Sequence, residues 1–275
     1  MTSQSILDRF RLDGKTAIVT GIGPGIGSHV ARAYALAGAN VVVAARTPEK
    51  VDKLAAEIVG EGGSALAVPC DVGVKEDLDR LLDAAQQEFG TVDILFNNAA
   101  ATRLQGLRNS LDASDEDWLD CLNVNLLAPY RLARMLVPAM KAKGNGSIIN
   151  VLTTAAFTVV EPQTAYACTK AGLALMTRYL AKECAPEVRV NAICPGTTGP
   201  VGVPAEETTG AMAGVMPYVP MHRVGSAEEH VGPALLLASD AATYTTGQVL
   251  FVDGGRVNTL GGQAYATDDG RRPQQ

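Results

Sequence analysis

Two residues that can move a proton together, Tyr166 and Lys170, lie four positions apart in a segment whose pattern predicts a helix. Side chains at i and i+4 leave the same face of a helix, so these two are neighbours. A tyrosine with a pKa near ~10 is a poor base at neutral pH, but a nearby ammonium favours its phenolate. The pair predicts acid–base chemistry on an alcohol or a ketone; an ordinary Tyr–Lys pair on a helix surface is the alternative.

A glycine-rich turn precedes this pair, with Gly21, Gly25 and Gly27 between a predicted strand and a predicted helix. Glycine lets the chain reverse tightly and lets a phosphate approach the backbone. The N-terminus of the helix that follows, at Ile26, presents unpaired N–H groups and a partial positive charge. The turn predicts a site for the pyrophosphate of a dinucleotide, and a plain strand–helix turn is the alternative.

The residue after the second predicted strand bears on the type of dinucleotide. An Asp or Glu in this region binds a free ribose 2′-OH, whereas an Arg accommodates a 2′-phosphate. The strand predicted over 41–45 is followed by Arg46. This favours NADP(H), with NAD(H) as the second choice, although an exposed Arg on a loop is also common.

Other polar residues follow the predicted strands, where ligands bind in open parallel sheets. Asp71 can accept from an adenine amino group or cap a turn, and Asn97 and Asn98 can bind a ligand or form a turn. Thr153 ends a strand, where its hydroxyl can donate to a substrate oxygen as charge develops. Thr154 is the adjacent competitor for that role.

Predicted strands and helices alternate along the chain. The strands cover 16–20, 41–45, 65–69, 94–96, 147–151, 188–193 and 248–252. The helices cover 26–37, 48–59, 75–89, 115–143 and 164–184. Ser114 can cap the fourth of these helices. Near-continuous Val/Ile/Leu strands in this order predict an α/β fold, a single-domain Rossmann-type doubly wound parallel sheet with helices on both faces.

The domain is expected to cover 1–255, followed by a polar, Gly-rich tail over 256–275. Segment 197–223 interrupts the alternation with prolines and glycines, which predicts a substrate loop or, alternatively, a variable surface loop. The apolar residues of this segment that can line a pocket are Val201, Val203, Met212, Val215, Met216 and Met221.

Composition narrows the function classes. The chain has 275 residues, 47% of them hydrophobic and 19% charged, as expected for a globular protein with a large core. Its net charge of −6 argues against a general affinity for nucleic acid or anionic membranes. No apolar run approaches the roughly 20 residues that span a bilayer. The scattered cysteines predict free thiols in a reducing cytoplasm, and the histidines show no metal-ligand spacing.

Taken together, these motifs resemble those of the short-chain dehydrogenase/reductases of the single-domain type, over residues 12–255. The matching motifs are Thr20-Gly21-x-x-x-Gly25-x-Gly27, Asp71, Asn97-Asn98-Ala99, Asn123-Val124-Asn125, Tyr166-x-x-x-Lys170, Pro195-Gly196 and Val252-Asp253-Gly254-Gly255.

The resemblance implies roles for individual residues. Tyr166 would be the acid/base, and Lys170 would bind the nicotinamide ribose and lower the tyrosine pKa. Asn125 would hold a water in a proton relay, Thr153 would stabilise the substrate oxygen, and residues 193–198 would pass the nicotinamide. The implied cofactor-binding residues are Gly21, Gly25, Ile26, Gly27, Arg46, Asp71, Val72, Asn98, Ala99, Tyr166, Lys170, Pro195, Gly196 and Thr198.

Three positions depart from the family pattern. Thr153 replaces the usual catalytic serine, which keeps the hydroxyl and adds a methyl group. Ala100 replaces a glycine next to the cofactor. Pro200 stands where a threonine is common, so Thr197 or Thr198 would take over the contact with the carboxamide.

The resemblance therefore predicts an NAD(P)-dependent oxidoreductase that interconverts a secondary alcohol and a ketone by hydride transfer. We expect a cytoplasmic homotetramer acting on a small and apolar molecule, without a metal, nucleic acid or membrane partner. The alternative is a catalytically weak nucleotide-binding regulator or scaffold on the same fold, which the altered serine position favours. A lyase or isomerase is a third and smaller possibility.

Overall fold

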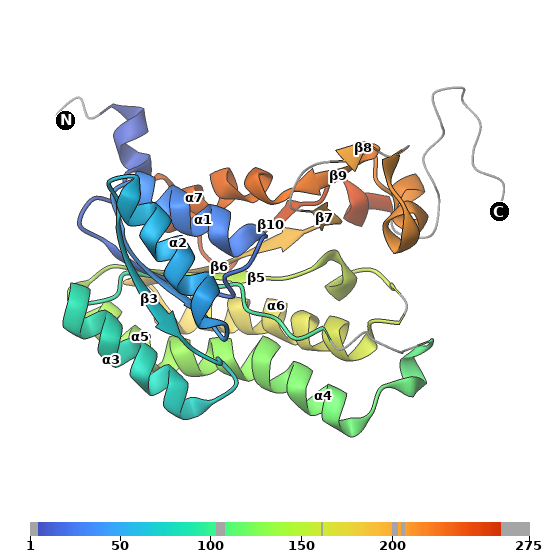
Figure 1. Cartoon of the computed structure of the whole chain (residues 1–275), viewed down its shortest axis with the longest axis horizontal. Coiled ribbons are helices and arrows are strands. Elements are labelled where there is room, and N and C mark those ends of the chain that lie inside the picture. Colours follow the sequence, from blue (N-terminus) through green and yellow to red (C-terminus); the bar gives the residue numbers. More distant parts are fainter. Residues whose placement is uncertain (1–4, 103–107, 161, 200–202, 205–206, 260–275) are drawn as a thin grey trace.

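A seven-stranded parallel sheet forms the centre of the protein, with helices above and below it (Figure 1). The structure is a computed structural model and describes residues 5–102, 108–160, 162–199, 203–204 and 207–259. The strands of this sheet are β1 (Thr16–Thr20), β2 (Asn40–Ala45), β3 (Ser64–Pro69), β4 (Ile94–Asn97), β5 (Gly146–Val151), β6 (Val188–Pro195) and β10 (Val249–Val252). They lie in the order β10-β6-β5-β4-β1-β2-β3.

Two layers of helices cover the sheet. The α-helices are α1 (Ile26–Leu36), α2 (Pro48–Gly60), α3 (Lys75–Phe89), α4 (Asp115–Leu122), α5 (Ala128–Lys143), α6 (Thr164–Cys184) and α7 (Val231–Ala238). Side chains alternate across a strand, so Ala17 and Val19 pack with α1, α2 and α7 while Ile18 packs with α3, α5 and α6. The predicted doubly wound parallel sheet is confirmed.

The strand order places the candidate site. The chain moves outward from β1 to β3, then returns to β4 on the other side of β1. At such a switch point the connections leave β1 and β4 in opposite directions and open a crevice at their carboxyl ends. The glycine turn follows β1, and Asn98 follows β4.

The predicted helix over 115–143 is interrupted. Ser114 caps it as expected, by accepting from the N–H of Asp117. A π-helical turn, η3 (Asn123–Leu127), separates α4 from α5, and the N–H of Ala128 donates to the carbonyl of Asn123, five residues back. Pro129 has no N–H to give to the carbonyl of Asn125, so the regular ladder cannot continue there. Single π turns of this kind are frequent at functional sites.

Segment 197–223 contains more regular structure than expected. Strands β7 (Thr198–Gly199), β8 (Val203–Pro204) and β9 (Arg223–Ser226) form a small sheet, and η6 (Gly210–Tyr218) is a 3-10 helix. Of the apolar residues proposed to line a pocket, Met216 packs with Val219 and Val224 in a small core, and Val215 packs against it. Met212 and Met221 are exposed. Val201 lies outside the described residues.

The remaining short helices are η1 (Ile6–Phe10), η2 (Ser110–Asp112), η4 (Thr154–Ala156), η7 (Ala227–His230), η8 (Asp240–Ala242) and η9 (Arg256–Thr259). Helix α7 was not among the predicted elements because its apolar residues surround Gly232 and Pro233 without a clear period. The domain limit at 255 stays a prediction, since residues 260–275 lie outside the described part of the chain.

Candidate active site

Three of the four glycines in the turn, Gly21, Gly25 and Gly27, were predicted to bind the cofactor, and they serve two different physical purposes. Gly21 has a φ of +76°, and a Cβ there would lie 2.6 Å from the backbone N and Cα of Ala99. A Cβ on Gly27 would lie 2.7 Å from the side-chain nitrogen of Asn98. Gly25, in contrast, precedes α1, and a Cβ there would meet no described heavy atom within 4 Å. Two glycines thus let the turn pack, and the third leaves the backbone open to a ligand.

Asn98 fixes this turn to the end of β4. Its side-chain nitrogen donates to the carbonyls of Thr20 at 3.1 Å and Gly21 at 2.8 Å. The hydroxyl of Thr20 accepts in return from the N–H groups of Asn98 and Ala99. Asn98 therefore holds the turn itself, a role that the sequence left open between ligand contact and turn formation.

A cavity of about 1050 Å³ extends from this turn along the carboxyl ends of β1 to β4. Predicted cofactor-binding residues in its wall are Gly21, Arg46, Asp71, Val72, Asn98 and Ala99. Ala100, which departs from the family pattern, also lines it. The volume suits a nucleotide, since ligand sites usually enclose roughly 300–1,000 Å³.

Basic and hydroxyl groups gather at the end of this cavity that follows β2. Arg46 is exposed there, and Thr47 and Lys50 line the same wall. Thr47 precedes α2, but its hydroxyl caps none of the described N–H groups of that helix. Sequence reasoning missed Lys50; its position in the first turn of α2, four residues after Arg46, was the available signal.

Asp71 caps a turn at the end of β3. Its Oδ1 accepts from the N–H of Gly73 at 2.9 Å, and its own N–H donates to Asp77 at 2.8 Å. The turn-capping interpretation therefore holds for Oδ1. The second carboxylate oxygen remains an acceptor in the cavity wall, so an adenine contact is compatible with the same geometry.

Helix α6 brings Tyr166 and Lys170 together as their spacing predicts. The Lys170 Nζ lies 6.0 Å from the centroid of the Tyr166 ring. It donates to the carbonyl of Val151 at 2.7 Å, and the lysine is only 2% exposed. Burial disfavours the ammonium and lowers the pKa of Lys170 to about 8.

The pKa of Tyr166 moves in the direction opposite to our expectation. Burial of the phenolate raises it to about 12, and the hydrogen bond with the side chain of Thr153 only partly offsets this. In the protein alone the pKa is therefore raised, and the lowering expected from Lys170 together with a bound nicotinamide stays a prediction. The ammonium lies 6.0 Å from the ring centroid and donates to the carbonyl of Val151, and its charge does not offset the rise in the phenol pKa that desolvation causes.

This influence on Tyr166 separates the two threonine candidates. The Thr153 side chain is the one that lowers the pKa of Tyr166, and its oxygen accepts from the N–H of Ala155 at 3.3 Å. Thr154 is buried, and its carbonyl accepts from Thr158. The geometry therefore favours Thr153 as the hydroxyl beside the acid/base residue.

Asn125 is fully buried in the π turn and joins two segments of the site. Its Oδ1 accepts from the N–H of Ala101 at 2.9 Å, and its Nδ2 donates to the carbonyl of Ala101 at 2.8 Å. Nδ2 also lies 3.1 Å from the hydroxyl of Thr169, which donates to the carbonyl of Tyr166. Thr169 was missed by sequence reasoning, although a hydroxyl between Tyr166 and Lys170 was visible.

The segment after β6 passes close to the end of β10. A Cβ on Gly196 would lie 2.6 Å from the Cα of Asp253, which explains the glycine after Pro195. The hydroxyl of Thr198 donates to the carbonyl of Gly196 at 3.2 Å. Thr197 instead lines a second cavity, so the two candidates for the carboxamide contact face different surroundings.

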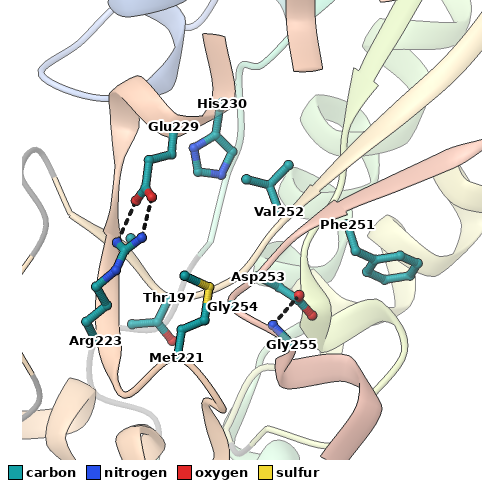
Figure 2. Close-up of a pocket in the computed structure, with 11 residues that line it drawn as sticks. Thr197, Met221, Arg223, Glu229, His230, Phe251, Val252, Asp253, Gly254 and Gly255 are labelled. Atoms are coloured by element: carbon teal, nitrogen blue, oxygen red, sulfur yellow. Dashed lines mark hydrogen bonds and ion pairs between the residues drawn. The ribbon is translucent and has the colours of Figure 1, made fainter. Parts of the chain in front are cut away.

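This second cavity, of about 320 Å³, lies between β10 and the turn from β9 to η7 (Figure 2). Met221 and the ion pair of Arg223 with Glu229 line it, with Nη1 to Oε2 at 2.8 Å. The hydrogen bond from Arg223 lowers the pKa of Glu229 to about 2. His230 is buried in the wall, and burial lowers the pKa of its imidazole.

Two other features concern the described residues alone. Within them, no cluster of three or more His, Cys, Asp or Glu side chains is placed to hold a metal ion. None of the helices that the structure describes is both long enough and apolar enough to cross a membrane.

Comparison with known proteins agrees with this geometry. A family model described as enoyl-(acyl carrier protein) reductase matches residues 21–256. The 7α-hydroxysteroid dehydrogenase of Escherichia coli K12 is 34% identical over 254 residues, which is 92% of this chain and 98% of the relative. The chain belongs to the short-chain dehydrogenase/reductase family.

Solved structures of this family bind both kinds of nicotinamide nucleotide. A 7α-hydroxysteroid dehydrogenase complexed with NADH and 7-oxo glycochenodeoxycholic acid has a TM-score of 0.82 and 32% identity, and the match covers 90% of this chain and 96% of that one. A gluconate 5-dehydrogenase from Burkholderia cenocepacia, in complex with NADP and tartrate, has a TM-score of 0.82, 33% identity and coverage of 92% and 99%. A nicotinamide nucleotide is therefore the supported cofactor, and the relatives are oxidoreductases.

Proposed function

We propose that this short-chain dehydrogenase/reductase is an NAD(P)-dependent oxidoreductase that interconverts a secondary alcohol and a ketone. The position of Tyr166, next to the buried Lys170 on α6 and close enough to Thr153 for that side chain to lower its pKa, carries the proposal. One substrate oxygen would accept from both hydroxyl groups. The test is a panel of ketones and alcohols with NADP(H) and NAD(H), followed by the absorbance of the reduced nicotinamide. A panel without any cofactor-dependent turnover would contradict the proposal.

The residues fit a dinucleotide. Gly25 leaves open space at the N-terminus of α1, where unpaired N–H groups favour a pyrophosphate. The cavity along β1 to β4 has room for the adenosine half, with Asp71 in its wall. Residues after β6, from Pro195 to Thr198, would contact the nicotinamide half. When bound, the reduced cofactor supplies the hydride that the carbonyl carbon accepts.

The protein's own groups would handle the proton. A phenol with a pKa of about 12 is protonated at neutral pH, so Tyr166 can donate to the alkoxide that forms as the ketone is reduced. Thr153 would donate a second hydrogen bond to the same oxygen. Lys170 uses one of its three donors on Val151, which leaves two for the ribose. Asn125 would connect the site to a water that returns the proton.

The regulator alternative loses its main support in this arrangement. It depended on the change from serine to Thr153, which could have moved the hydroxyl out of the site. The Thr153 side chain instead lies close enough to Tyr166 to lower its pKa. A competent acid/base pair favours the enzyme, and the substrate panel separates the two hypotheses.

The two directions of the reaction should respond differently to pH. Reduction uses the protonated Tyr166, so its kcat/KM is expected to stay flat between about pH 6 and 8. Oxidation uses the phenolate, whose fraction rises about tenfold per pH unit below the pKa, so its kcat/KM should climb toward pH 9. Initial rates in both directions over this range check the prediction. Faster oxidation at pH 6 than at pH 9 would contradict it.

We also propose that NADP(H) is the preferred cofactor, because Arg46 and Lys50 line the cavity after β2. The substitution Arg46→Asp removes a charged donor and adds a repulsive carboxylate. The ratio of kcat/KM for NADPH over NADH should fall about 100-fold, which corresponds to about 2.7 kcal/mol. Steady-state kinetics with both cofactors measure this ratio. Lys53→Asp is the matched control, since Lys53 lies on α2 outside the cavity wall.

Two results would refute this assignment. One is a wild-type protein that already prefers NADH strongly. The other is an equal shift of the ratio in Lys53→Asp, which would indicate a general charge effect. Lys50→Ala should shift the ratio in the same direction as Arg46→Asp but less, because it removes a cation without adding an anion.

For the substrate we propose a small apolar, cyclic carbonyl compound. Met212 and Met221 expose apolar surface in segment 197–223, and one related structure holds 7-oxo glycochenodeoxycholic acid. The panel should also contain polar hydroxy acids, because the gluconate 5-dehydrogenase structure holds tartrate. We further propose a homotetramer in the cytoplasm; exposed Leu175 on α6 offers apolar surface for self-association.

A further inference from the structure

The π turn η3 (Asn123–Leu127) contains two asparagines whose side chains bind different parts of the chain. Asn125 reaches toward Ala101 and α6, whereas Asn123 reaches the loop after β3. We infer that Asn123, oriented by Arg131, is a positioning residue that holds this loop against the adenosine half of the cofactor. The inference rests on the proposed use of a dinucleotide.

The orientation of the Asn123 amide is set by its two partners. Its Nδ2 donates to the carbonyl of Gly73 at 2.9 Å. Its Oδ1 accepts from Nη1 of Arg131, one turn into α5, at 2.7 Å. A guanidinium can only donate and a carbonyl can only accept, so the flipped amide would lose both bonds. Arg131 therefore locks the amide with its donor toward the loop.

Gly73 is fitted closely to this amide. A Cβ at that position would lie 2.8 Å from Nδ2 of Asn123 and 3.2 Å from Oδ1 of Asp71. The N–H of Gly73 donates to the same Asp71 oxygen. Asn123 thus binds the carbonyl of Gly73, and the N–H of the same glycine orients the Asp71 carboxylate.

Both partners of this contact border the large cavity. Asn123, Val124, Asp71 and Gly73 all line it. Part of the cavity wall is therefore built from the β3 loop and the π turn, and their separation depends on the bond between Asn123 and Gly73. A nucleotide base that packs between Val72 and the glycine turn needs this separation to be constant.

Asn123 and Asn125 serve different parts of the site because they lie two positions apart. Residues two positions apart point to nearly opposite sides of a helix. In the π turn, Asn123 therefore points to the proposed adenosine side and Asn125 points toward α6, which carries Tyr166. Loss of Asn123 should therefore weaken cofactor binding without changing the proton chemistry.

The test compares Asn123→Ala with wild type through the binding of ADP-ribose, the part common to both cofactors that lacks the nicotinamide. We expect about five- to tenfold weaker binding by calorimetry, as for one lost hydrogen bond. KM for the dinucleotide should rise similarly, with kcat, KM for the ketone and the pH profile unchanged. Asn145→Ala, at an exposed asparagine after α5, is the matched control.

A second variant keeps the test independent of folding defects. Arg131→Met leaves Asn123 in place but frees its amide to rotate, so ADP-ribose binding should weaken by about two- to fivefold. Unchanged ADP-ribose affinity in both folded variants would overturn the inference. Wild-type binding of ADP-ribose without any turnover would instead contradict the proposed function and leave the positioning role intact.

Discussion

Tyr166→Phe is expected to lower kcat/KM for ketone reduction by about 10³- to 10⁴-fold, the contribution of a well-placed general acid. The substitution removes a single hydroxyl, which is the group whose pKa the Thr153 side chain lowers and that would donate to the alkoxide. The ring and its contact with Lys170 stay in place. The dissociation constant for NADPH should therefore change by less than about twofold, since less than about 0.4 kcal/mol of binding is affected.

The matched control for this variant is Tyr179→Phe. Tyr179 lies on the same helix, but it is 61% exposed and lies outside both cavities. Its variant should keep full activity. Titration of intrinsic NADPH fluorescence measures cofactor binding, and initial rates measure turnover. Normal turnover by Tyr166→Phe would refute the acid/base role, and a loss of cofactor binding in that variant would show that the tyrosine acts in binding instead.

The sheet and most helices were predictable because their signals are local. The strand over 16–20 and the helices over 75–89 and 164–184 have the predicted bounds. In the two helices buried positions recur with the helical period, and the strand is a short run that is buried throughout, so neighbouring residues alone carry the information. Helix α7 lacks such a period, since it is apolar throughout and contains Gly232 and Pro233.

The candidate site was predictable where one element presents two residues, as α6 presents Tyr166 and Lys170. It was not predictable where a residue bonds to a distant part of the chain. Asn123 reaches Gly73, and Asn98 reaches Gly21, only after the sheet has formed. The residue types offered no preference between such a contact and an ordinary turn.

Protonation states were the least predictable property because they depend on burial. The sequence places an ammonium near Tyr166 but does not show how much water surrounds either group. In the folded protein, desolvation raises the pKa of Tyr166 and lowers that of Lys170. The same desolvation means that the buried ammonium of Lys170 reduces the free energy of unfolding, and urea unfolding can measure this reduction.

Lys170→Met is expected to lower kcat/KM by about 10²- to 10³-fold while leaving the protein at least as stable at pH 7. Turnover falls because the variant loses the positive charge beside Tyr166 and the donors proposed for the ribose. The lowering of the lysine pKa from 10.5 to about 8 corresponds to a cost of about 3 kcal/mol in the folded state. Against this, the variant leaves the Val151 carbonyl without its donor, which reduces the stability of the variant by about 1–3 kcal/mol.

The pH dependence of stability separates the desolvation cost of Lys170 from the cost of the unpaired Val151 carbonyl. Below about pH 8 the wild-type lysine is protonated both folded and unfolded, so the folded state bears the whole desolvation cost. Between about pH 8 and 10.5 the unfolded state holds more protons, so wild-type stability rises with pH relative to the variant. Urea unfolding of both proteins at pH 7 and pH 10 should therefore show the variant's relative stability decreasing with pH. Lys182→Met, at an exposed lysine of α6, should show no such change. A difference between wild type and Lys170→Met that is the same at both pH values would mean that the ammonium is not desolvated in the folded protein.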